Sequence, residues 1–112
     1  MADALTSKHC VPCEGGIPAL TADEIAVLMP QLDGWAVDDN KKLTKSYTFP
    51  DFVQALAFVN RAGAVAEDEG HHPDLLLTWG KVGVELTTHA IGGLSENDFI
   101  LAAKLDEVLG AS

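Results

Sequence analysis

The chain of 112 residues is poor in basic side chains: 7 lysines and arginines stand against 17 aspartates and glutamates, for a formal net charge of −10. An electrostatic field of this sign repels phosphate backbones and anionic lipid surfaces. We therefore expect the protein to bind neither nucleic acid nor a membrane surface directly.

Long apolar runs are also missing. Although 47% of the residues are hydrophobic, no run approaches the roughly 18 apolar residues that a membrane-spanning helix requires. Residues 1–8 lack the basic flank and apolar stretch of a secretory signal. These absences predict a soluble, cytoplasmic protein, and the chain length predicts a single domain.

Cysteine is scarce: the only two, Cys10 and Cys13, form one Cys-x-x-Cys beside His9. This spacing suits two or three zinc ligands or a redox pair. A tetrahedral zinc site needs four ligands, so a metal would require a remote histidine or a second subunit. We favour reduced cysteines in a flexible N-terminal arm over residues 1–18, followed by a single domain over residues 19–112.

Hydrophobic periodicity and capping signals predict an α+β fold. The expected elements are a helix over residues 22–29, strands near 35–37 and 43–49, a helix over 51–69, strands over 75–79 and 82–88, and a helix after residue 95. The order αββαββα predicts a four-stranded antiparallel sheet with three helices packed on one face.

Three of the four histidines, His71, His72 and His89, follow predicted helix or strand ends, where side chains reach a pocket or solvent. Imidazole accepts or donates protons near neutral pH, and a nearby carboxylate such as Glu67 can orient such a ring. The cluster predicts metal-free acid–base chemistry on a small molecule.

Structural roles are the alternative for each of these residues. His71 and His72 would then solvate a loop or cap a helix C-terminus, and His89 would be a satisfied strand-end residue. Asp98 fits the N3 position of a capping box that begins at Ser95. A metal site from His71, His89 and a carboxylate is a further alternative, although no compact His-x-His or His-x-x-x-His spacing supports it.

The spacing of several polar residues resembles one known family. The motif Glu67-x-x-x-His71-His72-Pro73 is followed by Trp79, Thr88-His89 and Asp98, and the similarity begins near residue 18. In this combination the chain resembles the pterin-4a-carbinolamine dehydratase family. The resemblance implies dehydration of 4a-hydroxytetrahydrobiopterin to quinonoid dihydropterin, without metal or bound cofactor, which recycles the tetrahydropterin of aromatic amino-acid hydroxylation.

The resemblance also implies roles and partners. His71 and His89 would be the acid–base pair, and His72 would bind or protonate the substrate. Supporting or substrate-binding roles would fall to Glu67, Pro73, Trp79, Thr88 and Asp98. The family forms dimers that join sheet edges, often paired into tetramers. Two alternatives are a protein-binding, regulatory dimerisation cofactor and an enzyme acting on another pterin.

Overall fold

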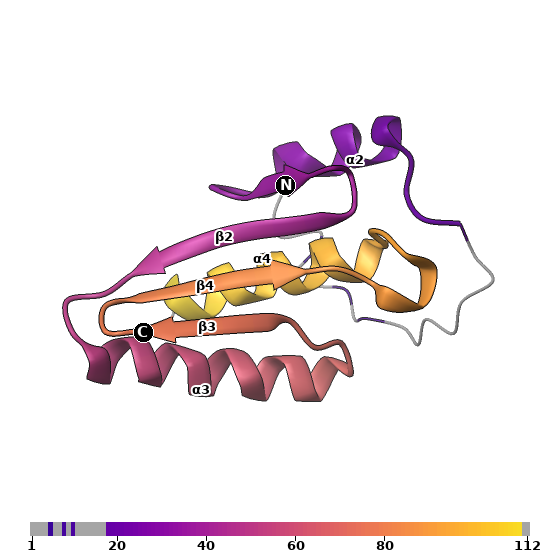
Figure 1. Cartoon of the computed structure of the whole chain (residues 1–112). Helices are drawn as coiled ribbons and strands as arrows, with labels where there is room; N and C mark the ends of the chain where they lie inside the picture. Colours follow the sequence, from indigo (N-terminus) through magenta and orange to yellow (C-terminus); the bar gives the residue numbers. More distant parts are fainter. Residues whose placement is uncertain (1–4, 6–7, 9, 11–17, 111–112) are drawn as a thin grey trace.

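The computed structural model describes residues 5, 8, 10 and 18–110. Its centre is one antiparallel sheet with the strand order β1-β2-β4-β3 (Figure 1). The strands are β1 (Ala36–Asp38), β2 (Lys42–Thr48), β3 (Asp74–Thr78) and β4 (Lys81–Leu86). The predicted four-stranded antiparallel sheet is therefore confirmed, and β1 and β3 are its edges.

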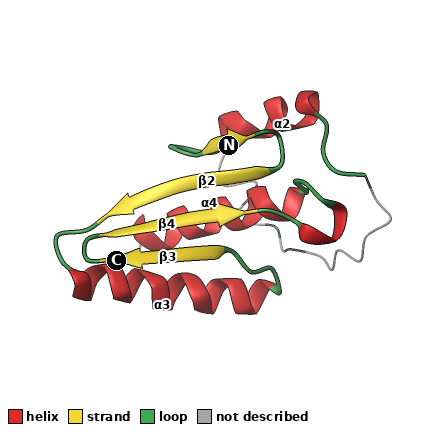
Figure 2. Ribbon diagram, in the orientation of Figure 1, coloured by secondary structure: helices red, strands yellow, loops and turns green. Residues whose placement is uncertain are grey.

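Three helices complete the predicted order of elements. They are α2 (Ala22–Leu28), α3 (Phe52–Glu69) and α4 (Glu96–Gly110), with short 3₁₀ turns at η1 (Met29–Gln31) and η2 (His89–Ile91). The long helices α3 and α4 pack together against the sheet, and α2 lies near β1 (Figure 2). The α+β fold in the order αββαββα is confirmed.

Local sequence signals account for the helix ends. At the start of α2, the Thr21 N–H donates to Glu24 Oε1 at 2.8 Å and the Glu24 N–H donates to Thr21 Oγ1 at 3.2 Å, a complete capping box. Asp51 caps α3 by accepting the Gln54 N–H. Gly70 ends α3 with a left-handed φ of 68°, which glycine adopts without strain, and this turn directs the chain into the histidine loop.

The core lies between the sheet and the two long helices. Leu43, Val82, Val84 and Leu86 point from the strands toward this layer and are fully or almost fully buried. The helical spacing of the apolar residues 101, 105, 108 and 109 predicts that they form the buried stripe of α4. Its first two members are buried, but the run Phe99–Ala103 is buried without a break. Helix α4 is thus enclosed more widely than an amphipathic stripe predicts, because the sheet, α3 and neighbouring loops surround its first turns.

The second hairpin differs from the prediction at both ends. Its turn is formed by Trp79 and Gly80, and β4 ends at Leu86 although the strand was predicted to reach residue 88. The Thr88 N–H donates to the Gly93 carbonyl at 2.8 Å, which draws the chain out of the ladder toward α4. The early end of β4 places residues 87–89 beside the C-terminus of α3.

Among the helices within the described ranges, none is long and apolar enough to cross a membrane. Cys13 of the Cys-x-x-Cys and the neighbouring His9 lie outside the described residues, whereas Cys10 lies inside them. The division into an N-terminal arm and one domain stays a prediction.

Candidate active site

A pocket of about 260 Å³ brings the three predicted histidines together. It lies where the C-terminus of α3, the end of β4, η2 and the start of α4 meet. Its walls are formed by Gly70, His71, His72, Thr87, Thr88, His89, Ala90 and Asn97. A larger hollow of about 560 Å³ lies on the open face of the sheet, but no histidine lines it. The histidine pocket is therefore the candidate site for acid–base chemistry.

His71 is held by a buried carboxylate. Its Nε2 lies 2.6 Å from Asp98 Oδ1, and the side chains of His71 and Asp98 are 12% and 0% exposed. His71 follows the left-handed turn at Gly70, and Asp98 lies in the first turn of α4. The pair therefore depends on the packing of the end of α3 against the start of α4.

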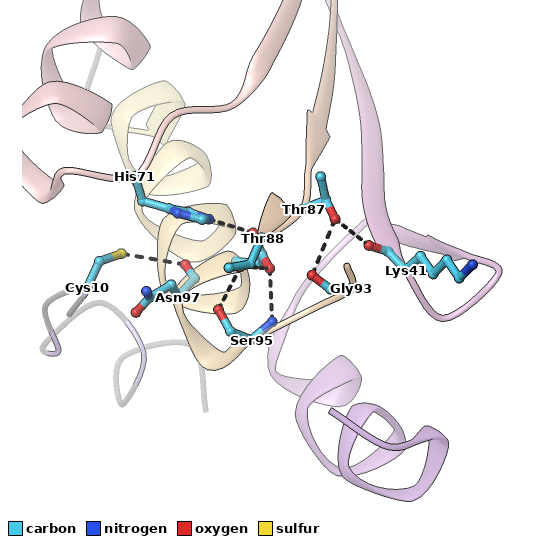
Figure 3. Close-up of polar contacts among 9 residues, drawn as sticks. Cys10, Lys41, His71, Thr87, Thr88, Gly93, Ser95 and Asn97 are labelled. Atoms are coloured by element: carbon cyan, nitrogen blue, oxygen red, sulfur yellow. Dashed lines mark hydrogen bonds and ion pairs between the residues drawn. The ribbon is translucent and has the colours of Figure 1, made fainter. Parts of the chain in front are cut away.

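The second oxygen of Asp98 accepts two further hydrogen bonds. Oδ2 receives the Ser95 N–H at 3.0 Å and the Thr88 hydroxyl at 2.8 Å, and the Thr88 and Ser95 hydroxyl oxygens are 2.8 Å apart (Figure 3). A hydroxyl has one hydrogen, and that of Thr88 is directed to Asp98. The Ser95 hydroxyl must therefore donate to Thr88, which forms a chain of donors that ends on the Asp98 carboxylate.

This arrangement changes the interpretation of Ser95. The predicted capping box forms only its carboxylate half, in which Asp98 accepts the Ser95 N–H. The Ser95 hydroxyl bonds to Thr88, and the Asp98 N–H donates to the Ser95 carbonyl at 3.1 Å. Asp98 meets the capping partner through Oδ2 and His71 through Oδ1, so the predicted capping role is compatible with the predicted site role.

The hydrogen bonds also indicate which nitrogen of His71 is occupied by Asp98 and which is left for a substrate. An ionised Asp98 that already accepts two donors on Oδ2 takes the His71 Nε2–H on Oδ1. Nδ1 is then the nitrogen left for a substrate. In other enzymes, a buried carboxylate behind a histidine selects the ring tautomer and stabilises the imidazolium that forms during the reaction.

The other two histidines are much more open. His72 Nε2 lies 2.8 Å from Glu67 Oε1, with side chains 62% and 81% exposed. A surface pair of this kind contributes at most about 1 kcal/mol. His89 begins η2 and is exposed, and its carbonyl accepts the Gly92 N–H at 3.2 Å. The His89 ring makes no hydrogen bond with any residue in the described part of the chain. Both rings are free to meet a small molecule.

Four predicted site residues lie outside the pocket lining: Glu67 and Asp98, which pair with His72 and His71, and Pro73 and Trp79. Pro73 follows His72 immediately and is half-buried. Trp79 is 68% exposed and lies beyond the far end of β3. At about 3.3 Å per strand residue, the length of β3 separates it from the histidine end by roughly 15–20 Å. Within one chain, Trp79 is not brought to the histidines.

Several pocket residues were not predicted from the sequence. Thr87, Ala90 and Asn97 line the pocket, and Ser95 supports it from behind. Thr87 donates its hydroxyl hydrogen toward the carbonyls of Lys41 and Gly93, at 2.6 and 3.3 Å. No residue type or spacing marks these positions in advance, because each becomes relevant only through the close approach of β4 to α4.

Residues 18–108 match the family model described as pterin 4 alpha carbinolamine dehydratase. The chain belongs to this family. A protein of Rickettsia bellii is 51% identical over 104 residues, covering 92% of each chain. A protein of Rubrobacter xylanophilus is 47% identical over 104 residues, covering 93% of this chain and 97% of the relative. Both relatives bear the name of the same dehydratase, given provisionally.

The relationship extends beyond the limits of the family model at the N-terminus. A protein of Methylococcus capsulatus, also provisionally named as this dehydratase, is 48% identical over 106 residues and covers 94% of this chain. A match of that extent begins at or before residue 8 of a 112-residue chain. The aligned region shared with this relative therefore includes residues 8–17, which precede the region that the family model matches.

Solved structures support the same relationship. A structure titled transcriptional coactivator/pterin dehydratase, from Brucella melitensis, superposes with a TM-score of 0.75 at 35% identity, covering 80% of this chain and 97% of that one. A pterin dehydratase-like protein, titled as a RuBisCO assembly factor of the alpha-carboxysome, gives a TM-score of 0.60 at 24% identity. The second likeness shows the shared fold alone.

Proposed function

We propose that this protein is a cytoplasmic 4a-hydroxytetrahydrobiopterin dehydratase. It converts the carbinolamine to quinonoid dihydropterin and water, and so recycles the tetrahydropterin used in aromatic amino-acid hydroxylation. The observation that carries the proposal is the convergence of three histidines on one pocket, with the buried Asp98 behind one of them. Membership of the dehydratase family supplies the substrate class.

The reaction needs one acid and one base. The bond from C4a to the hydroxyl oxygen breaks, the proton on the neighbouring N5 leaves, and a double bond forms between C4a and N5. Protonation of the departing hydroxyl yields water. Because both steps are proton transfers near neutral pH, they suit positioned imidazoles, each worth roughly 10²–10⁴-fold in rate.

We assign the base to His71 and the acid to His89. Asp98 stabilises the imidazolium that forms when Nδ1 of His71 takes the N5 proton. His89 is exposed, so after giving its proton to the leaving hydroxyl it recovers one from solvent. The solvent also removes the proton from His71, which returns both rings to their starting states.

The remaining motif residues bind or support. His72 lines the pocket and pairs with the exposed Glu67, so both are available to contact the polar pterin ring. Pro73 restricts the backbone of His72 to extended conformations, which limits the directions its ring can take. Thr88 holds Asp98 in place. Every proposed step is a proton transfer between protein, substrate and water, so the proposal includes no resident metal or cofactor.

A homo-oligomer joined through β3 would give Trp79 a role. β3 is an edge strand, and Leu76 at its centre and Trp79 just beyond its end are each 68% exposed. Antiparallel pairing of two β3 strands about Leu76 would place Trp79 of the partner subunit beside Pro73, at the histidine end. We propose this dimer, or a tetramer built from it, as the active form.

Subunit complementation tests this arrangement. Trp79→Ala and His89→Ala subunits, each inactive alone, should regain activity when refolded together, because a mixed dimer contains one site with neither substitution. Light scattering should show the dimer in both variants. A monomeric wild type with full activity would contradict the proposal.

A protein-binding role is the second candidate. The open sheet face has a hollow lined by residues that include Thr44, Leu76, Gly83 and Glu85, and the solved Brucella relative is titled as a coactivator as well as a dehydratase. Co-purification of a defined partner that survives His71→Ala and is lost in Leu76→Asp would support this role. An enzyme for another pterin would instead be revealed by a panel of 4a-hydroxypterins that differ in side chain.

The deciding experiment is a dehydration assay. Purified, chelator-treated protein is mixed with freshly generated 4a-hydroxytetrahydropterin, and the loss of water is followed by absorbance. We expect acceleration by the wild type and a loss of about 10²-fold or more in His71→Ala. A folded wild type that gives no acceleration would refute the enzymatic proposal and favour the binding role.

A further inference from the structure

Cys10 connects the two segments that carry His71 and Asp98. Its backbone N–H donates to Glu69 Oε1 at 2.8 Å, and its Sγ lies 3.5 Å from the Asn97 carbonyl oxygen (Figure 3). Glu69 is the last residue of α3, two positions before His71, and Asn97 directly precedes Asp98. The end of α3 and the start of α4 are therefore joined twice, once by the His71–Asp98 pair and once through Cys10.

Glu69, which accepts the Cys10 N–H, is a buried carboxylate. Its side chain is 3% exposed, and Oε2 lies 2.7 Å from Lys104 Nζ on α4, whose side chain is 12% exposed. A carboxylate with this burial needs its oxygens satisfied, since removing a partner from a buried ion pair is strongly destabilising. The backbone N–H of Cys10 is one of the donors to Glu69, so Cys10 contributes to the polar contacts of a group buried beside the candidate site.

Two further residues hold the segment. Leu5 is 1% exposed and belongs to the hydrophobic core. Lys8 Nζ lies 2.9 Å from Glu96 Oε2 in the first turn of α4, with both side chains about half exposed. Leu5 thus provides apolar anchoring, whereas the Lys8 pair is at the surface and adds little.

We propose that Leu5, Lys8 and Cys10 form a positioning element, the N-terminal tie, which holds the end of α3 against the start of α4 and so keeps His71 within hydrogen-bonding distance of Asp98. Cys10 is then a positioning residue whose thiol serves packing and a hydrogen bond. The effect on catalysis rests on the proposed function, whereas the effect on the His71–Asp98 geometry does not.

The chemistry of the thiol agrees with this role. Burial, followed by the negative charge of Glu69, raises the pKa of Cys10 to about 12. Cys10 therefore keeps its proton at neutral pH and can donate it to the Asn97 carbonyl. Metal binding and nucleophilic attack use the thiolate, which this environment disfavours. The match to relatives also reaches this segment.

Two substitutions separate the contacts of the tie. Cys10→Pro removes the N–H that Glu69 accepts, and Cys10→Ala keeps that N–H while removing the thiol. Leu5→Asp places a charge in a buried position and should release the segment without altering any pocket residue. Val27→Asp, at a residue of α2 that is 71% exposed, is the matched control for the added charge.

The first measurement follows the His71 ring rather than activity. In ¹⁵N-labelled protein, the Nε2 proton shared with Asp98 should be protected from exchange, and its exchange rate should rise at least about tenfold in Cys10→Pro and Leu5→Asp because the hydrogen bond opens more often. Cys10→Ala loses only the thiol bond to Asn97 and should raise the exchange rate less than Cys10→Pro does, whereas Val27→Asp should stay close to the wild type. Iodoacetamide should alkylate Cys10 faster in Leu5→Asp than in the wild type, which reports release of the segment.

Kinetics gives the second measurement. We expect kcat to fall about tenfold or more in Cys10→Pro and Leu5→Asp, with KM changed less than about threefold, since misplacing a catalytic group by ~1 Å costs up to about 10²-fold. Cys10→Pro changes no core side chain, so it decides the question if Leu5→Asp fails to fold. Folded variants with wild-type kcat and a protected Nε2 proton would overturn the inference. An inactive wild type would refute the proposed function, while proton exchange would still decide the role of the tie.

Discussion

Replacing Asp98 by asparagine tests the assignment of His71 as the base. Asparagine keeps the shape of the side chain but carries one acceptor oxygen and one NH₂ group. The oxygen will occupy the Oδ2 position, where the Ser95 N–H and the Thr88 hydroxyl both donate. The reverse orientation would direct the NH₂ group at the Ser95 N–H, a donor against a donor.

The NH₂ group then faces Nε2 of His71. Because it can only donate, His71 must accept on Nε2 and carry its proton on Nδ1, the nitrogen that we assign to the substrate. The base is thus blocked in its neutral form, and the charge that stabilised the imidazolium is lost. Substituting the buried aspartate behind a catalytic histidine costs about 10⁴-fold in kcat in a serine protease, so we expect a loss of roughly 10²–10⁴-fold here.

The assay is the dehydration rate at saturating substrate, with KM measured alongside. KM should change by less than about threefold, because Asp98 is fully buried and does not line the pocket. Glu96→Gln, which neutralises a half-exposed carboxylate in the same helical turn, is the matched control and should keep full activity. A folded Asp98→Asn variant with kcat within threefold of the wild type would refute the role of the carboxylate.

Three further outcomes follow from the same contacts. His89→Ala should lower kcat by about 10²-fold or more with the fold intact, whereas His72→Ala should mainly raise KM. If both variants changed only KM, the assignment of His89 as the acid would be contradicted. Ser95→Ala should lower kcat by about three- to tenfold, and Ser95→Thr should restore it. A wild-type kcat in Ser95→Ala would show that the hydrogen bond from Ser95 to Thr88 is not needed for the reaction. Asp106→Ala should lower the unfolding free energy by about 2–4 kcal/mol in urea titrations while kcat is unchanged, because three donors lose their acceptor far from the pocket; an unaltered midpoint would contradict this.

The elements with short-range signals were predicted well. The capping box at Thr21 and the glycine stop at Gly70 each act within a few residues of the chain, so their residue types carry the information. The histidine cluster was also predictable, because His71 and His72 follow a helix end and His89 follows a strand end. Both are positions beyond a helix or strand end, although they share a pocket only because the residues after β4 lie beside the end of α3 and the start of α4.

Contacts between distant residues were not predictable in the same way. Ser95 shows a local capping signal, but its hydroxyl bonds to Thr88, which arrives from the end of β4. Cys10 reaches Glu69 and Asn97, which are 59 and 87 positions away in the chain. Trp79 belongs to the family motif but lies at the other end of β3 from the histidines. A single sequence contains no local pattern that specifies any of these three placements.

Helix α4 carries two aspartates whose carboxylates each contact three donor groups. Asp98 accepts from the Ser95 N–H, Thr88 and His71, and Asp106 accepts from Trp35, Lys45 and Tyr47. Both are carboxylates with three donors. Indole N–H, ammonium and phenol groups keep their protons near neutral pH, and burial raises the pKa of Tyr47 further.

The donors therefore decide what each aspartate can do. None of these three partners of Asp106 exchanges a proton near neutral pH, so that carboxylate holds Trp35, just before β1, and strand β2 against α4. At Asp98 one partner is an imidazole, whose other nitrogen remains for the pocket. The same arrangement of a buried carboxylate is structural at one end of the helix and suited to acid–base chemistry at the other, and this difference is the physical reason to place the reaction at His71.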